Sequence, residues 1–157
     1  LGEKLFLCTQ NVDSLHEAAG TKRVMHMHGE LFRSRCERED CRSPTFEDNR
    51  TYETLDAIAR CACGGRVRPD IVWFGEMPKF MLEIKRAVQG CDLFITIGSS
   101  GAVYPAAGLV GEIAYRRASG ERPRAIYVGL ERPQNADRFQ ECHLGKAGDL
   151  LPSMFEF

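Results

Sequence analysis

The chain has 157 residues, enough for one domain with a small insertion, and its 43% hydrophobic and 27% charged content is typical of a folded globular protein. A net charge of -1 offers no basic surface for a polyanion, so nucleic-acid binding is not expected. Apolar runs are too short to span a bilayer and no signal region opens the chain, so we expect a cytoplasmic protein without a membrane partner.

The N-terminal third predicts a strand, a short helix and a second extended segment. The strand is the apolar run Leu5–Cys8. The helix, residues 14–19, is predicted to have Asp13 as N-cap and Gly20 as its stop, with a buried stripe of Leu15, Ala18 and Ala19. Alternating apolar and polar residues at Val24–His28 indicate the second extended segment. Polar groups at the end of a strand, such as Gln10 and Asn11, commonly face a ligand.

Residues 36–63 differ in character, because they are rich in charged residues and carry four cysteines with little apolar periodicity. Residues 52–59 are expected to add one or two helical turns. Four thiolates can complete the tetrahedral shell of a structural zinc ion, although the spacing departs from the usual two C-x-x-C pairs, and free thiols remain the alternative. The predicted ligands are Cys36, Cys41, Cys61 and Cys63. The remaining cysteines lie near apolar segments and are expected to be inert.

The C-terminal half predicts alternating strands and helices, and hence an α/β fold with a parallel sheet and helices on both faces. Apolar character returns at Val67–Phe74, and a helix is expected from Pro78 to Gly90, with Phe80, Ile84, Ala87 and Val88 on its packed face. The β-branched run Leu93–Ile97 predicts a strand buried on both faces. A helix at 106–118, a strand at 125–128 and a helical tail from Asp137 onward, with Leu150 and Met154, complete the pattern.

Two features suggest chemistry. His28 suits a general base, because imidazoles as a class exchange a proton near neutral pH, although a single histidine is as often structural. His26, His16 and His143 are expected to be structural. The small-residue loop Gly98–Gly101, between a strand and a helix, has backbone N–H groups that suit a phosphate or ribose, although such turns are common without a ligand.

Four ordered motifs, with a fainter fifth, give the chain a family resemblance. It resembles the sirtuins, NAD-dependent protein deacylases, and in particular a bacterial branch with a VWFGE loop. The motifs are TQNVDSLHEAAG at 9–20, HMHGEL at 26–31, RPDIVWFGEMP at 68–78, GSSGAVYPAAG at 98–108 and, more faintly, GKAGDLLP at 145–152.

The resemblance implies a Rossmann-like domain with an inserted zinc ribbon, NAD as co-substrate, and acyl-lysine proteins as partners. It implies that His28 is the general base acting on a ribose hydroxyl of NAD, and that the products are free lysine, nicotinamide and O-acyl-ADP-ribose. The implied NAD-binding residues are Gln10, Asn11, Asp13, Gly98, Ser99, Ser100 and Ala147. The implied peptide-binding residues are Val72, Trp73, Phe74, Gly75, Glu76, Val103 and Tyr104.

The expected organisation is a first Rossmann-like part at 1–31, a zinc-binding insertion at 32–68 and a second Rossmann-like part at 69–157. The family's glycine-rich phosphate loop has no match, so we expect an N-terminally truncated catalytic domain that binds NAD poorly by itself. Gly129 stands where relatives have an asparagine that touches the adenosine ribose. The alternatives are a non-catalytic zinc-ribbon and Rossmann interaction module, and a protein ADP-ribosyltransferase.

Overall fold

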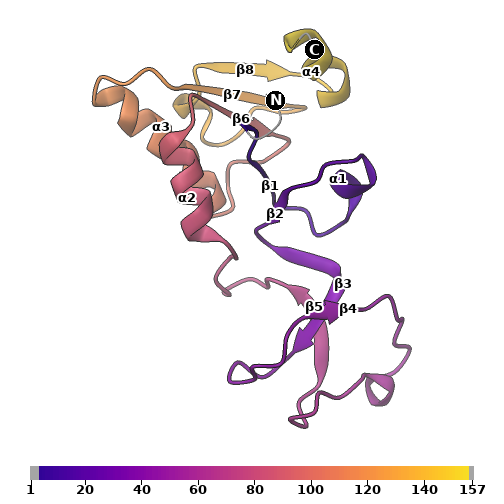
Figure 1. Cartoon of the computed structure of the whole chain (residues 1–157). Helices are drawn as coiled ribbons and strands as arrows, with labels where there is room; N and C mark the ends of the chain where they lie inside the picture. The colour runs from indigo at the N-terminus through magenta and orange to yellow at the C-terminus, as the bar shows by residue number, and fades with distance from the viewer. Residues whose placement is uncertain (1–3, 156–157) are drawn as a thin grey trace. The chain divides into compact units, whose positions relative to one another are not determined.

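The computed structural model describes residues 4–155, which form two compact units divided between Met81 and Leu82 (Figure 1). The first unit contains the motifs at 9–20, 26–31 and 68–78 and the four clustered cysteines. The second unit contains the motifs at 98–108 and 145–152 and the larger parallel sheet.

The first unit begins with a two-stranded parallel sheet. Strand β1 (Leu7–Thr9) pairs with β2 (Val24–His26), with Thr9 opposite His26. Helix α1 (Leu15–Ala18) lies between the two strands in the sequence. The predicted strand and helix are confirmed within a residue or two, and the second extended segment ends two residues earlier than expected.

The predicted N-cap is wrong by one residue, because Ser14 is the N-cap of α1 and makes no side-chain capping bond. Asp13 Oδ1, just before it, accepts a hydrogen bond of 3.1 Å from the backbone N–H of Leu15, and Gly20 follows the helix with a φ of +90°, as predicted. The predicted buried stripe is wrong, since no residue of α1 is buried and Leu15 is 72% exposed. A single helical turn presents too little surface to pack into a core.

The rest of the first unit is built on an antiparallel sheet in the order β4-β3-β5. Its strands are β3 (Gly29–Cys36), β4 (Phe46–Glu47) and β5 (Val67–Ile71), and a bulge interrupts the β3–β5 ladder between Glu30 and Ser34. The cysteine-rich segment leaves the end of β3 and returns at the start of β5. Within it, the predicted helical structure is one 3-10 turn, η2 (Leu55–Ala57).

Helix α2 (Met81–Gly90) leads into the second unit. Ile84 and Val88 are buried as predicted. The placement of Phe80 on the packed face is wrong: Phe80 precedes the helix in a left-handed conformation, with a φ of +59°, and is 44% exposed.

The second unit contains a parallel sheet in the order β6-β7-β8. The strands are β6 (Leu93–Ile97), β7 (Arg124–Gly129) and β8 (Glu141–Leu144). The turn η3 (Ala106–Gly108) and helix α3 (Leu109–Ala118) connect β6 to β7, which confirms the predicted βαβ unit. The turn η4 (Ala136–Arg138) precedes β8, so the prediction of a helical segment from Asp137 onward is wrong for residues 139–146. Helix α4 (Ala147–Met154) confirms the later part of that prediction.

Burial within this sheet is concentrated on its central strand. Residues 125–129 of β7 are all buried, whereas Leu93 and Ile97 of β6 are 39% and 50% exposed. The prediction that β6 is buried on both faces is therefore wrong for the described residues, because β6 is an edge strand of this sheet. Between residues 4 and 155, no helix is long and apolar enough to cross a membrane.

Candidate functional site

His28 lies in the turn between β2 and β3, where both its side chain and its backbone are held. Its Nδ1 lies 3.1 Å from the carbonyl oxygen of Gln10, and its own carbonyl accepts a hydrogen bond of 2.8 Å from the N–H of Val72. Because a carbonyl oxygen only accepts, Nδ1 must carry a proton. A neutral His28 therefore has its lone pair on Nε2, which is the atom that can take a proton from a substrate.

The predicted cofactor residues of the first unit lie on the segment that holds His28. Asn11 donates its backbone N–H to Thr9 Oγ1 at 3.1 Å, and the N–H of Leu31 bonds to the carbonyl of Val12 at 2.8 Å. Together with the Asp13 contact to α1, these bonds give residues 10–13 a defined backbone path. The structure thus brings Gln10 next to His28 and places Asn11 and Asp13 on the same anchored segment.

The predicted peptide-binding loop, residues 72–76, is closed on itself. The N–H of Trp73 donates to Glu76 Oε2 at 3.0 Å, and the N–H of Glu76 donates to the Trp73 carbonyl at 2.9 Å. Gly75 has the φ of +91° that this turn requires, while Phe74 is fully exposed. The apolar side chains of this loop are therefore partly open to solvent, with Trp73 56% exposed.

The buried side chain of Arg68 contacts two residues of this loop. The Arg68 guanidinium stacks 3.9 Å from the centre of the Trp73 ring and pairs with Glu76 Oε1 at 2.5 Å. The backbone N–H of Trp73, followed by the Arg68 charge, holds the pKa of Glu76 below its ordinary value. Glu76 thus faces its own loop, where it orders Trp73.

In the second unit, the predicted nucleotide-binding residues lie at the carboxyl edge of the parallel sheet. Gly98 follows β6 and donates its N–H to the Val128 carbonyl at 2.8 Å, while the N–H of Gly145 donates to the Gly129 carbonyl at 2.9 Å. Ala147 begins α4 immediately afterwards. In parallel α/β sheets this edge is where ligands bind.

Neighbouring parts of the second unit hold this loop in place. The carbonyl of Ser100 accepts a hydrogen bond of 2.9 Å from the N–H of Gln134, and Ser99 belongs to the same turn. Asn135 donates to the carbonyl of Ala107 at 2.8 Å. The two remaining predicted substrate residues, Val103 and Tyr104, lie exposed between this loop and η3.

The four predicted metal ligands converge. Their sulfur atoms all lie within 4.8 Å of one another, with 3.5 Å between Cys36 and Cys63 and 3.7 Å between Cys41 and Cys61. Tetrahedral zinc with Zn–S bonds of about 2.3 Å separates its sulfur ligands by about 3.8 Å. The contact with the Ser43 hydroxyl, 3.3 Å from Cys61 Sγ, is the main cause that lowers the pKa of the Cys61 thiol to about 6. Further hydrogen bonds from Cys63 and Cys41 also lower this pKa, whereas the pKa of Cys36 is raised. The donor set and its spacing therefore fit structural zinc, despite the irregular sequence spacing.

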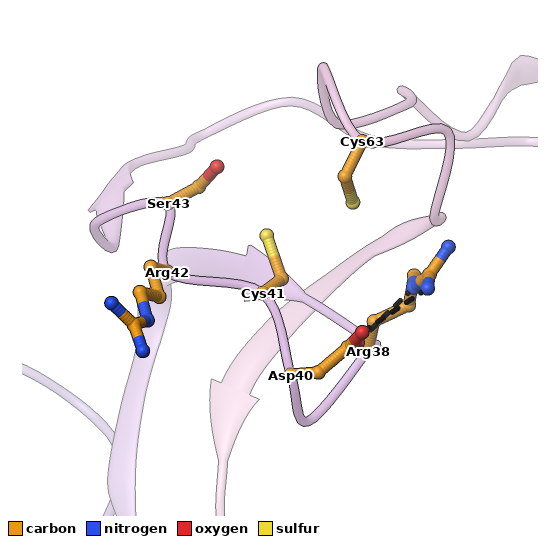
Figure 2. Close-up of a pocket in the computed structure, with 6 residues that line it drawn as sticks. All are labelled: Arg38, Asp40, Cys41, Arg42, Ser43 and Cys63. Carbon is orange, nitrogen blue, oxygen red and sulfur yellow. Dashed lines mark hydrogen bonds and ion pairs between the residues drawn. The ribbon is translucent and has the colours of Figure 1, made fainter.

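Figure 2 shows a pocket beside this cluster. Cys41, Cys63 and Ser43 face a common space, while Arg38 is paired with Asp40 at its rim. Four cysteines already complete a tetrahedral shell, so the site leaves no open position for catalysis.

Sequence reasoning missed several residues that support the site. The sequence assigns no role to Glu17 or Arg68. In the structure, Glu17 pairs with His26 and Arg68 pairs with Glu76, and both partners lie in predicted functional motifs. Asn135 and Ser43 were also overlooked. Local periodicity carries no signal for such contacts.

Comparison with known proteins decides the family. A sequence model of the Sir2 family matches residues 1–105, which is more than half of the chain. The chain belongs to the Sir2 family.

The sequences of individual relatives align with nearly the whole of this Sir2-family chain. It is 46% identical over 155 residues to an NAD-dependent protein deacylase of Caulobacter vibrioides, covering 99% of this chain and 62% of the relative. An NAD-dependent protein deacylase of Pasteurella multocida is 43% identical, with 97% and 62% covered. The chain thus spans about three fifths of the length of these curated relatives.

Solved Sir2 structures share the fold. A Sir2 homologue in complex with NAD superposes with a TM-score of 0.82 at 32% identity, covering 96% of this chain and 56% of the other. A Sir2 complex with a p53 peptide and NAD+ gives a TM-score of 0.77 at 27% identity, with 95% and 61% covered. The predicted Rossmann-like α/β fold with helices on both faces and an inserted cysteine module is thereby confirmed.

Proposed function

We propose that this Sir2-family chain supplies the base-bearing part of an NAD-dependent protein-lysine deacylase. The single observation that carries the proposal is the ring orientation of His28, whose Nδ1 is committed to Gln10 and whose Nε2 is left as an acceptor. A general base needs an unprotonated nitrogen aimed by a fixed partner, and this bond supplies both.

The chemistry would divide between NAD and the protein. NAD, the co-substrate, supplies an electrophilic ribose carbon once nicotinamide leaves, so the acyl-lysine amide need not be attacked directly. His28 would accept the proton of a ribose hydroxyl through Nε2. Gln10, Asn11 and Asp13 would line the nicotinamide and ribose end, and the Gly98–Ser100 loop and Ala147 would bind the adenosine side.

The peptide would bind along two segments. Val72, Trp73 and Phe74 would surround the lysine stem, with Gly75 allowing the turn and Glu76 ordering it. Val103 and Tyr104 would offer a second backbone edge. Extended pairing of this kind binds many sequences, because its affinity comes from main-chain hydrogen bonds.

The zinc ion would serve the fold. Held by Cys36, Cys41, Cys61 and Cys63, it would join the end of β3 to the start of β5 and so fix the cysteine module. The proposal also includes a cytoplasmic location, which cell fractionation would test. Acyl-group preference and protein targets would follow from a panel assay.

The test uses an extended protein, meaning this chain lengthened to the size of its relatives. It is incubated with NAD and a panel of acyl-lysine peptides, and nicotinamide release and peptide mass are followed. We expect loss of the acyl mass, and a fall in rate of at least about 100-fold in His28→Ala, the scale of general-base catalysis. His16→Ala, which changes a histidine of α1, is the matched control and should retain activity.

Three outcomes would reject the proposal. Nicotinamide release that is unchanged in His28→Ala would remove the assigned base. An acceptor that gains mass would indicate ADP-ribosyl transfer instead. A folded extended protein that releases no nicotinamide would favour a non-catalytic interaction module.

A further inference from the structure

His26, two residues before the proposed base, has both ring nitrogens engaged. The residue is buried, with 5% exposure, and its Nδ1 lies 3.2 Å from the Asn11 carbonyl oxygen while its Nε2 lies 2.8 Å from Glu17 Oε1. A carbonyl oxygen and a carboxylate both accept. The two contacts are therefore satisfied together only when both ring nitrogens carry protons, as in the imidazolium.

The surroundings of His26 favour that charged form. Burial lowers the pKa of His26, but the bonds to Glu17 and to the Asn11 carbonyl, with the charges of Glu17 and Glu30, outweigh burial and raise the pKa above its usual value. The His26 contact in turn lowers the pKa of Glu17, with a smaller contribution from His16. Glu17 and Glu30 are thus the charged groups that act on the His26 ring, while His16 acts on Glu17.

The two histidines of the HMHG motif thus have different roles. Each donates from Nδ1 to the carbonyl of a successive residue, His28 to Gln10 and His26 to Asn11. His28 keeps a free acceptor nitrogen for chemistry, whereas the second nitrogen of His26 is occupied by Glu17.

We propose that His26 is a positioning residue, which as an imidazolium ties the Asn11 backbone to Glu17 of α1 and so fixes the proposed NAD-binding segment 10–13. This inference rests on the proposed function, and it assigns pH sensitivity to the same site. When His26 loses its proton, one donor remains for two acceptors. One of the two bonds is then lost, and the segment between Asn11 and Glu17 loosens.

The kinetic test measures KM for NAD and kcat of the extended protein between pH 6 and pH 9. In the wild type, we expect KM for NAD to rise about 5- to 10-fold across the titration of His26, with a smaller change in kcat. Glu17→Gln preserves the shape but removes the carboxylate charge, so the rise should begin at lower pH. His26→Gln should have a high KM at pH 6 and no such rise.

A matched histidine–glutamate pair lies in the second unit. His143 Nε2 is 3.0 Å from Glu141 Oε2 on β8, away from segment 10–13 in the sequence, so His143→Gln should reproduce the wild-type profile. If wild type and His26→Gln share one KM profile, or if His143→Gln alters it as strongly, the positioning role is wrong.

A direct titration separates this inference from the proposed function. Imidazole ¹⁵N resonances should show His26 protonated on both nitrogens above pH 6.5 in the wild type, and Glu17→Gln should lower its midpoint. If the titration midpoint of His26 is the same in Glu17→Gln as in the wild type, the positioning role of His26 is wrong even if the enzyme is active. Absence of nicotinamide release overturns the deacylase proposal, while this titration still decides how His26 is held.

Discussion

Replacing Gly29 with alanine is the most direct test of how the turn at His28 is built. Gly29 has a φ of +83° and pairs with Ile71 across the β3–β5 ladder. A β-carbon at this position would lie 1.8 Å from the carbonyl oxygen of Asp70 and 3.0 Å from Cα of Ile71. Because these are backbone atoms, relief requires the two strands to separate. Gly20 is the natural control, since its φ is +90° but a β-carbon there meets nothing within 4 Å.

The two substitutions share one cost and differ in another. Placing alanine in the left-handed conformation costs about 1–2 kcal/mol in both variants. Gly29→Ala adds overpacking against the backbone, about 1–3 kcal/mol, for a total of about 2–5 kcal/mol. A loss of 1 kcal/mol lowers Tm by about 2–4 °C in a chain of 157 residues, so Gly29→Ala should melt at least about 2 °C below Gly20→Ala.

The assay is urea and thermal unfolding of both variants beside the wild type, followed by circular dichroism. Gly29→Ala should also disturb the neighbouring base, so nicotinamide release by the extended protein should fall more than its loss of stability explains. Equal destabilisation of the two variants, within about 0.5 kcal/mol, would refute the close approach of Gly29 to Asp70.

Two further predictions concern the cysteine module. Metal analysis should find about one zinc per chain, with most of it lost in Cys61→Ser and retained in Cys91→Ser, and less than about half an equivalent in folded wild type would contradict the site. The Arg50 guanidinium, 2.7 Å from Asp48, is the main cause of an Asp48 pKa well below its usual range, with Tyr52 adding a bond of 3.0 Å. The charged form of Asp48 therefore stabilises the fold above about pH 4, and this stability is lost as the pH falls towards the folded pKa. In urea unfolding from pH 5 to pH 2, Asp48→Asn should show a weaker acid dependence than wild type; parallel curves would exclude this role.

Predictions made from local periodicity were the most successful. The element type can be predicted from a few residues for strand β6, for helix α3 and for strand β7. The order of these three elements implies a right-handed βαβ unit. The sequence does not predict strands β3, β4 and β8. β3 mixes charged and aromatic residues without alternation, and β8 is only four residues long.

Burial was harder to predict than element type. The same apolar pattern is buried in β7 and half-exposed in β6, because exposure depends on whether a strand is central or at an edge. Leu15 illustrates the same limit in a helix, since an apolar side chain on one isolated turn has no surface to pack against.

The family motifs, the α/β class and the choice of His28 as candidate base can be read from the residues alone, because they depend on residue type and order. Which atoms those residues use depends on how the chain folds. The fold brought four irregularly spaced cysteines within 4.8 Å and directed Glu76 onto its own loop. It also distinguished His28, with one ring nitrogen free to accept, from His26, with both committed to acceptors. The contacts of the two histidines and the closest cysteine pairs join residues 9 to 27 positions apart, so they are set by how the chain crosses itself and no local pattern records them.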